Sequence, residues 1–281
     1  DHGYSRQKIS DLFGSYGEMN LYAAEATKRT SVPKFSVSHN VPAGEALIEL
    51  EKLALERSEL MKSLSVKEID VNSTVYKYLE SRLQHKNLHR FGYNNKGLHI
   101  FNLNQDGTKV VSFQIKTFND TAKYVTFDIS RMYKLFNLEI PIEDEELKAR
   151  VIETSMIFNI LNVRLVGLLT VFEGPLDSFL MSNSIGLGSV EKDTSKIEKL
   201  PNIRFFFDND RAGKEAMVEK LDRGFPVFLW SKMFKDLKIE RYVNKIKDYN
   251  DLLNHCYKNR IKIFEHIDSF FSNEKLDKYY L

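Results

Sequence analysis

Residues 168–178 (LLTVFEGPLDS) and 203–213 (IRFFFDNDRAG) each place acidic residues directly after a short apolar run. A short apolar run bounded by turn residues is typical of a buried parallel strand. Ligands bind at the carboxyl ends of such strands, so Glu173 is expected to meet Asp208 and Asp210 at one sheet edge. Crowded carboxylates repel one another, and their hard oxygen atoms favour Mg²⁺ or Mn²⁺. These residues therefore predict a divalent-metal site.

A third motif, KDYNDLL at residues 247–253, follows another strand-like run at residues 226–230. In chain order the three patterns are E-G-x-x-D, D-x-D-x-A-G and K-D-x-N-D-L-L. Together they resemble the TOPRIM domain, in the order found in DNA primases, and the resemblance spans roughly residues 67–253. The alternation of apolar runs and helical segments from residue 168 onwards independently predicts an α/β fold, with a parallel sheet and crossover helices.

The resemblance implies a role for each acidic residue of these motifs. The catalytic, metal-linked set is Glu173, Asp208 and Asp210, and the supporting metal-binding acids are Asp177 and Asp248. In a D-x-D pattern, both carboxylates project to the same side of an extended segment because side chains alternate along it. The alternative for any one of these acids is an ordinary surface turn residue.

An antiparallel sheet is predicted before the parallel one. Alternating runs at residues 98–104 and 109–117 flank an Asp-Gly pair, which is typical of a hairpin. A third strand is expected at residues 123–129. This block resembles the small subdomain that precedes TOPRIM in primases.

The resemblance also implies four residues that contact nucleotide or template, namely Lys116, Lys123, Lys247 and Asn250. Lys116 stands where bacterial members usually have Arg. Asn250 stands where many bacterial members have Asp and bacteriophage members often have Asn. The alternative for an exposed strand lysine is a solvated side chain.

Helical spacing of apolar residues predicts the remaining elements. An amphipathic helix of about five turns is expected at residues 44–64. Further helices are expected at residues 143–163, 248–258 and 260–271. The predicted domains are an N-terminal helical segment (1–65), the antiparallel subdomain (66–150), the TOPRIM domain (151–260) and a C-terminal helix (261–281). The first of these resembles the tail that follows a zinc ribbon in phage primases, and no zinc is expected in this chain.

Composition limits the function classes. The net charge is only +2 over 281 residues, so nucleic-acid contacts should form a local patch. Residues 66–142 hold 11 Lys and Arg against 7 Asp and Glu, which places the basic excess in the antiparallel part. The single cysteine, Cys256, excludes a disulfide within the chain and a cysteine-rich zinc site. No apolar run reaches the length of about 18 residues needed to span a membrane.

The resemblance implies a bacteriophage-type DNA primase core. It would synthesise short RNA primers from NTPs on a single-stranded DNA template, using Mg²⁺ or Mn²⁺. Its expected partner is a replicative helicase, fused or separate, and its expected location is the cytoplasm. The alternatives are a TOPRIM metal-dependent nuclease and a non-catalytic module that binds single-stranded DNA or a helicase. The antiparallel block with Lys116 and Lys123 favours the primase.

Overall fold

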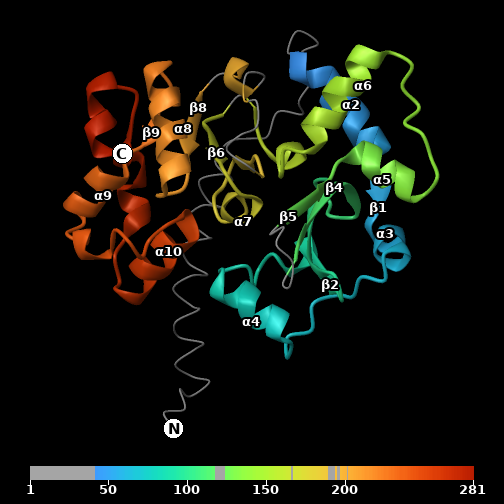
Figure 1. Cartoon of the computed structure of the whole chain (residues 1–281), viewed down its shortest axis with the longest axis horizontal. Coiled ribbons are helices and arrows are strands. Elements are labelled where there is room, and N and C mark those ends of the chain that lie inside the picture. The colour runs from blue at the N-terminus through green and yellow to red at the C-terminus, as the bar shows by residue number, and fades with distance from the viewer. Residues whose placement is uncertain (1–41, 118–123, 166, 189–193, 195–196, 201) are drawn as a thin grey trace, which may run out of the picture. The chain divides into compact units, whose positions relative to one another are not determined.

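Two five-stranded sheets organise the structure, one antiparallel and one largely parallel (Figure 1). The computed structural model describes residues 42–117, 124–165, 167–188, 194, 197–200 and 202–281. These residues belong to a single unit, residues 41–281. The segment before residue 42 and the predicted template contact Lys123 lie outside the described residues. Within the described part, no helix is both long enough and apolar enough to cross a membrane.

The antiparallel sheet has the strand order β1-β4-β3-β2, and β5 also pairs with β4. Its strands are β1 (Leu55–Glu56), β2 (Phe91–Asn94), β3 (Gly97–Leu103), β4 (Lys109–Lys116) and β5 (Tyr124–Phe127). The predicted hairpin is confirmed, because β3 and β4 pair across the turn that contains Gly107. This glycine has a φ of +77°, a conformation that other residues adopt only with strain. The predicted third strand is confirmed as β5.

The second sheet has the strand order β10-β9-β8-β6-β7. Its strands are β6 (Leu169–Phe172), β7 (Ser184–Gly186), β8 (Ile203–Phe206), β9 (Val227–Phe228) and β10 (Phe271–Ser272). The β6–β7, β6–β8 and β8–β9 pairs are parallel, as the alternating sequence pattern predicts, and β10 runs antiparallel to β9. The apolar runs of β6 and β8 are buried throughout, because the strands lie inside the sheet.

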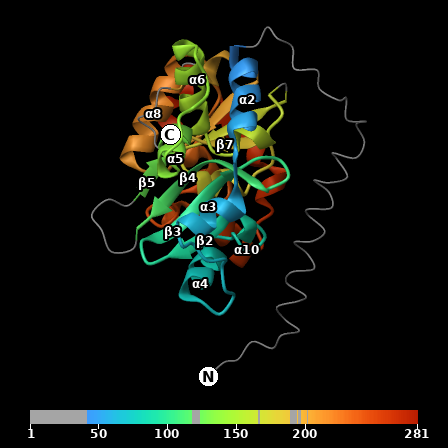
Figure 2. The ribbon, with the colours of Figure 1, turned by 90° about the vertical axis from the view of Figure 1, so that its right-hand side faces the viewer.

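Nine α-helices are found among the described residues. They are α2 (Pro42–Leu53), α3 (Arg57–Ser63), α4 (Thr74–Ser81), α5 (Ile129–Leu135), α6 (Glu145–Ser155), α7 (Pro175–Ser178), α8 (Arg211–Asp222), α9 (Trp230–Asp236) and α10 (Tyr249–Lys258). Figures 1 and 2 show α4 beside α10, where the Asn254 side chain donates a hydrogen bond to the Ser81 carbonyl (3.0 Å). This contact joins the antiparallel part to the last helix of the parallel part.

Two predicted stretches of helix are wrong. The helix predicted at residues 44–64 is interrupted by β1, because Leu55 and Glu56 pair with β4. The helix predicted at residues 260–271, and with it the C-terminal helix of 261–281, is replaced by 3₁₀ turns and by β10.

The predicted domain boundaries cut through packed structure. Strand β1 places residues 55–56 in the antiparallel sheet, before the predicted boundary at residue 66, and α6 crosses the predicted boundary at residue 151. One apolar cluster runs from Leu50 and Phe113 of the antiparallel part to Leu169 and Phe205 of the parallel part. The two parts therefore share a core.

Buried amide side chains fix the two sheets to each other. Asn102 on β3 donates hydrogen bonds to the carbonyls of Ser155 (3.1 Å) and Ile157 (2.9 Å) and accepts one from the Asn159 backbone (2.8 Å). The Asn159 side chain then donates to the Ser184 carbonyl at the start of β7 (2.8 Å). Hydrogen bonds between buried polar groups and the backbone favour one arrangement of the surrounding chain.

We expect Phe206→Ala to lower the free energy of unfolding by about 3–5 kcal/mol. The Phe206 ring is buried against five other aromatic rings in the parallel half and stacks on Phe228 with ring centroids 3.9 Å apart. Val71→Ala is the control, because Val71 is 59% exposed and its loss should change the free energy by under about 0.5 kcal/mol. Urea unfolding measures both variants. A loss below about 1 kcal/mol for Phe206→Ala would contradict this packing.

Candidate active site

A pocket of about 200 Å³ opens where the two halves of the structure meet. The antiparallel part and α4 contribute Arg82, Gln114 and Tyr124. The parallel part contributes Glu173, Gly174, Pro175, Leu176, Asp177, Gly188, Asp208 and Asp248. The pocket therefore gathers acids from all three sequence motifs and places them opposite polar side chains of the other half.

Strand register explains why Glu173 lies near Asp208. Phe172 and Phe206 are paired residues of the parallel strands β6 and β8, so the segments that follow leave the sheet at the same edge. The start of α8 packs tightly beneath this edge, because a Cβ on Gly213 would lie 2.2 Å from the Asp208 carbonyl oxygen. Only glycine fits there without moving the Asp208 backbone.

The five predicted acids occupy different environments. Asp208 and Glu173 line the pocket, whereas Asp210 is exposed and caps α8 by accepting a hydrogen bond from the Gly213 N–H (2.8 Å). Asp177 is buried and accepts a hydrogen bond from the Asn250 N–H (3.0 Å). Asp248 caps α10, which turns one of its oxygens towards the helix N-terminus.

Burial and mutual repulsion shift the acids towards their neutral forms. Burial raises the pKa of Asp208 to about 9, and the charges of Asp177, Glu173, Asp248 and Asp210 add to the shift. Burial and then Asp210 raise the pKa of Glu173 to about 7, against a hydrogen bond from the Asp208 backbone. Burial, followed by the charge of Asp248, also raises the pKa of Asp177. The pocket therefore concentrates negative charge that only a cation or protons can neutralise.

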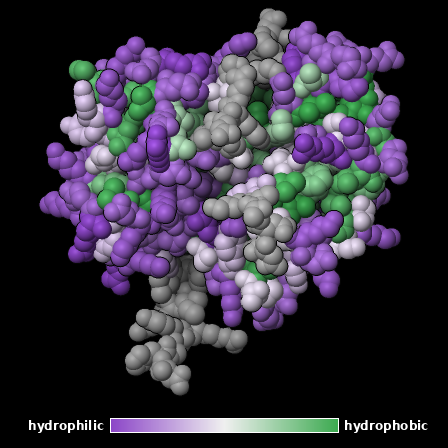
Figure 3. All heavy atoms as spheres, viewed as in Figure 1, coloured by the Kyte–Doolittle hydropathy of each residue, from purple (hydrophilic) through white to green (hydrophobic). Residues whose placement is uncertain are grey.

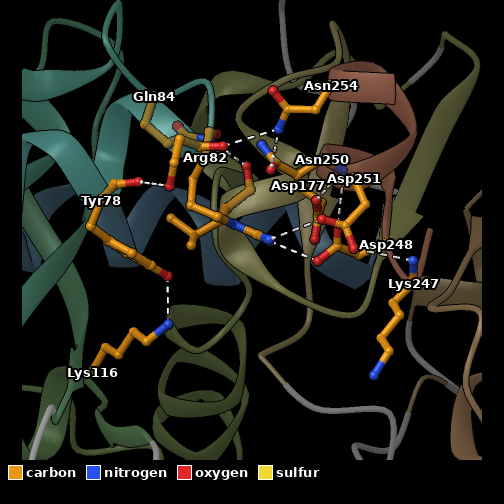
Figure 4. Close-up of polar contacts among 12 residues, drawn as sticks. Tyr78, Arg82, Gln84, Lys116, Asp177, Lys247, Asp248, Asn250, Asp251 and Asn254 are labelled. Carbon is orange, nitrogen blue, oxygen red and sulfur yellow. Dashed lines mark hydrogen bonds and ion pairs between the residues drawn. The ribbon is translucent and has the colours of Figure 1, made fainter. Parts of the chain in front are cut away.

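Arg82, directly after α4, supplies part of the missing positive charge (Figure 4). Its guanidinium donates to Asp248 Oδ2 at 2.8 Å and approaches Asp251 Oδ1 at 3.8 Å. Burial disfavours the charge on Arg82, but Asp248 and Asp177 outweigh this effect and raise its pKa. Gln84 holds this segment in place by donating a hydrogen bond to the Leu176 carbonyl (2.9 Å).

The predicted nucleotide-binding residues Lys116, Lys247 and Asn250 do not line the pocket. Lys116 donates a hydrogen bond to the Tyr78 hydroxyl (2.5 Å). Its ammonium lies 5.6 Å from the centre of the ring of Tyr124, the residue of β5 that pairs with Lys116 of β4. The Lys247 side chain is exposed and extends away from Asp177 (Figure 4). Asn250 is buried, with its backbone N–H donating to Asp177 (3.0 Å) and its side-chain oxygen accepting a hydrogen bond from Asn254 (3.1 Å).

The sequence analysis assigned no site role to two residues that line the pocket, Arg82 and Gln114. Arg82 stands at helical spacing from the apolar residues Val75, Tyr78 and Leu79, and a charged residue within such a stripe is the signal that could have identified it. Tyr124 follows the predicted Lys123 directly, and Gln114 alternates with the apolar residues of β4. Gln114 is buried, and its Oε1 atom has no hydrogen-bond partner, which leaves an acceptor at the pocket.

The donor set fits a divalent cation in its chemistry. Carboxylate oxygens are the ligands that Mg²⁺ and Mn²⁺ prefer, and Glu173 Oε2 is buried without a hydrogen-bond partner. Among the described residues, no three His, Cys, Asp or Glu side chains already have the arrangement of a metal site. The acids are therefore gathered, but they do not form a closed cage.

Comparisons with known proteins find similarity only to solved structures. No protein-family model matches the chain, and neither does any curated protein. The zinc-binding and RNA polymerase domains of the Aquifex aeolicus primase align over 94% of this chain and 76% of their own length, with 14% identity and a TM-score of 0.33. The RNA polymerase domain of Mycobacterium tuberculosis primase DnaG aligns over 95% and 93%, with 12% identity and a TM-score of 0.33. A DnaG primase catalytic domain bound to single-stranded DNA aligns over 91% and 85%, with 13% identity and a TM-score of 0.31. These similarities transfer no residue role to this chain.

Without metal, the protein should lose stability as the pH rises. The folded-state pKa values of Asp208 (about 9) and Glu173 (about 7) exceed their ordinary values of 3.8 and 4.5. Their contribution is therefore fully present below about pH 4 and is lost as the pH rises through the folded values. Asp208→Asn should stabilise the metal-free protein by about 2 kcal/mol near pH 8, because Asn is neutral without taking up the proton that Asp208 must bind on folding at this pH.

Thermal and urea unfolding from about pH 4 to 9 in chelator measures this effect. Asp236→Asn is the matched control, because Asp236 is exposed on α9. Equal pH profiles for wild type and Asp208→Asn would contradict the predicted repulsion.

A double-mutant cycle should detect the ion pair between Arg82 and Asp248. Both side chains are mostly buried, at 22% and 15% exposure, so Arg82→Gln should cost about 2 kcal/mol of unfolding free energy. The coupling with Asp248→Asn should be about 1–3 kcal/mol. The control is the exposed pair Arg211–Glu215, whose coupling should stay under about 0.5 kcal/mol. Coupling at Arg82 no larger than in the control would show that the pair contributes little.

Proposed function

We propose that this chain is the catalytic core of a TOPRIM-type DNA primase that synthesises short RNA primers from NTPs on a single-stranded DNA template. The observation that carries the proposal is the pocket. Acids of the E-G-x-x-D, D-x-D and K-D-x-N-D segments converge there, through Glu173, Asp208 and Asp248. Polar and aromatic side chains of the antiparallel part complete its lining.

The acids would hold Mg²⁺, or Mn²⁺ in its place. Glu173, Asp208 and Asp210 are the proposed ligands, with Asp177 and Asp248 as supporting acids. When bound, a divalent cation offsets the charge of the triphosphate and of the developing alkoxide. The raised pKa values support this role, because they reflect negative charge that lacks a counter-ion.

The chain's own residues suit nucleotidyl transfer. The attacking 3′-hydroxyl loses a proton as the new phosphodiester bond forms and pyrophosphate leaves. Glu173 has an unpartnered carboxylate oxygen at the pocket, which suits a group that accepts this proton. Arg82 brings positive charge to the opposite wall, where triphosphate or template phosphates would lie, and Lys116 adds a second cation beside Tyr124, which lines the pocket.

Helix α10 is the proposed support of the acidic side. Asp177 accepts the Asn250 N–H and Asp248 caps the helix, so both acids are held by backbone donors, and Asp248 is held by Arg82 as well. Rigid support of this kind keeps catalytic groups in a productive geometry. A replicative helicase, fused or separate, and a cytoplasmic location follow from the proposed role in replication.

A primer-synthesis assay tests the proposal. Wild type, incubated with template, labelled NTPs and Mn²⁺, should yield short RNA products. Asp208→Asn should reduce product formation by about 100-fold or more while the protein stays folded. Asp236→Asn should retain wild-type activity, because its exposed carboxylate is no part of the pocket.

Three outcomes would contradict the proposal. Full activity of Asp208→Asn would refute the assigned site. Metal-dependent cleavage of the DNA by wild type without any NTP incorporation would instead identify a nuclease, in which the same acids activate water. Binding of single-stranded DNA with neither activity would identify a non-catalytic module.

A further inference from the structure

A basic segment follows β9 and takes no part in the proposed chemistry. Residues 232–247 contain six Lys and Arg residues and only two acidic residues, Asp236 and Glu240. The segment includes most of α9, the 3₁₀ helix Glu240–Tyr242 (η4) and the residues that lead into α10. It lies in the parallel half of the chain, whereas the sequence placed the basic excess in the antiparallel half.

Side chains of this segment and of α10 form one cluster around Tyr242. The Arg241 guanidinium lies 4.8 Å from the centre of the Tyr242 ring and the Lys245 ammonium 5.9 Å from it. The His255 ring lies 4.2 Å from the same centre. Burial lowers the pKa of His255, and the charges of Arg241 and Lys258 lower it further, which places Lys258 in the same field. We call Arg241, Tyr242, Lys245, His255 and Lys258 the Tyr242 cluster.

The cations of this cluster have no acidic partner in the described part of the chain. Arg241, Lys245 and Lys258 are exposed and form no ion pair among the described residues. By contrast, Lys52 and Lys262 each pair with a glutamate, at 2.6 and 2.9 Å. Figure 3 shows mainly hydrophilic side chains over α10 and its surroundings. The cluster therefore presents like charges that a polyanion would neutralise.

Hydrogen bonds fix this basic segment to the acidic loop of the pocket. Asn209, between Asp208 and Asp210, donates its side-chain N–H groups to the carbonyls of Val243 (3.0 Å) and Ile246 (2.9 Å). Its backbone N–H donates to the Lys247 carbonyl (2.6 Å). The next residue, Asp248, lines the pocket. A strand bound along the cluster would therefore run towards the acids.

We infer that the Tyr242 cluster binds the phosphodiester backbone of a single nucleic-acid strand and guides it to the pocket. The inference rests on the proposed function for the identity of the strand, which is either template DNA or the RNA product. Phosphate contacts made by exposed cations need no particular base sequence. They release counter-ions, so the strength of binding falls as salt rises.

Fluorescence anisotropy with labelled oligonucleotides tests the inference. The probes are single-stranded DNA and RNA of one sequence and about 20 nucleotides, which is longer than the site of one small binding domain. The test variant is Arg241→Gln/Lys245→Gln, and the control is Lys52→Gln/Lys262→Gln. Both variants lower the net charge equally, but the control removes lysines that already face a carboxylate.

We expect the test variant to bind at least about tenfold more weakly than wild type near 50 mM salt. The slope of log affinity against log salt should fall by about 1.4, because two phosphate contacts of a single strand are lost. The control should stay within about twofold of wild type. The probe, DNA or RNA, for which the test variant loses more affinity identifies the bound strand.

Wild-type affinity and salt slope in the test variant would overturn the inference and leave the proposed function intact. An equal loss in the control would also overturn it, since general charge would then explain the binding. Absence of binding to both probes by wild type would count against the inference and the proposed function together. The separate primer-synthesis assay of Asp208→Asn tests the proposed catalytic site and does not test strand binding by the Tyr242 cluster.

Discussion

Electrostatic repulsion among four carboxylates is the constraint on which the pocket depends. The register of β6 and β8 forces Glu173 and Asp208 together, and the start of α10 brings Asp248 towards Asp177. Burial makes this crowding costly, because charges in a poorly solvated site interact strongly. The aromatic packing of the parallel sheet stabilises the strands that hold the acids. Arg82 then offsets part of the charge from the other half of the structure.

The sequence predicted the elements whose stability is local. The apolar runs of β6 and β8, and the Asp-Gly turn between β3 and β4, carry their own signals and are found where expected. Strands β1, β7 and β10 have two or three residues each, and they exist because a neighbouring strand offers hydrogen-bond partners. Such short pairings depend on tertiary structure, so the periodicity of residues 44–64 and 260–271 suggested helices instead.

The candidate site divides in the same way. The motifs identified the acids, because Asp208 and Asp248 follow strand-like runs within short, recognisable patterns. They did not identify Arg82 or Gln114, whose place in the pocket follows from how α4 and β4 pack against the parallel half. Lys116 lies on the predicted strand, but the sequence did not reveal its bond to Tyr78. Contacts between residues distant in sequence cannot be predicted until the fold is known.

The pairing of Arg82 with Asp248 also has a consequence for how the chain folds. The two residues are 166 positions apart, so their contact forms only after most of the chain has been ordered. Contacts between such distant residues slow folding, because the closure entropy is lost before the contact stabilises the chain. The acids of the parallel half therefore gain their internal counter-charge only where the two halves pack together. The pocket is in this sense a property of the packed halves rather than of either half alone.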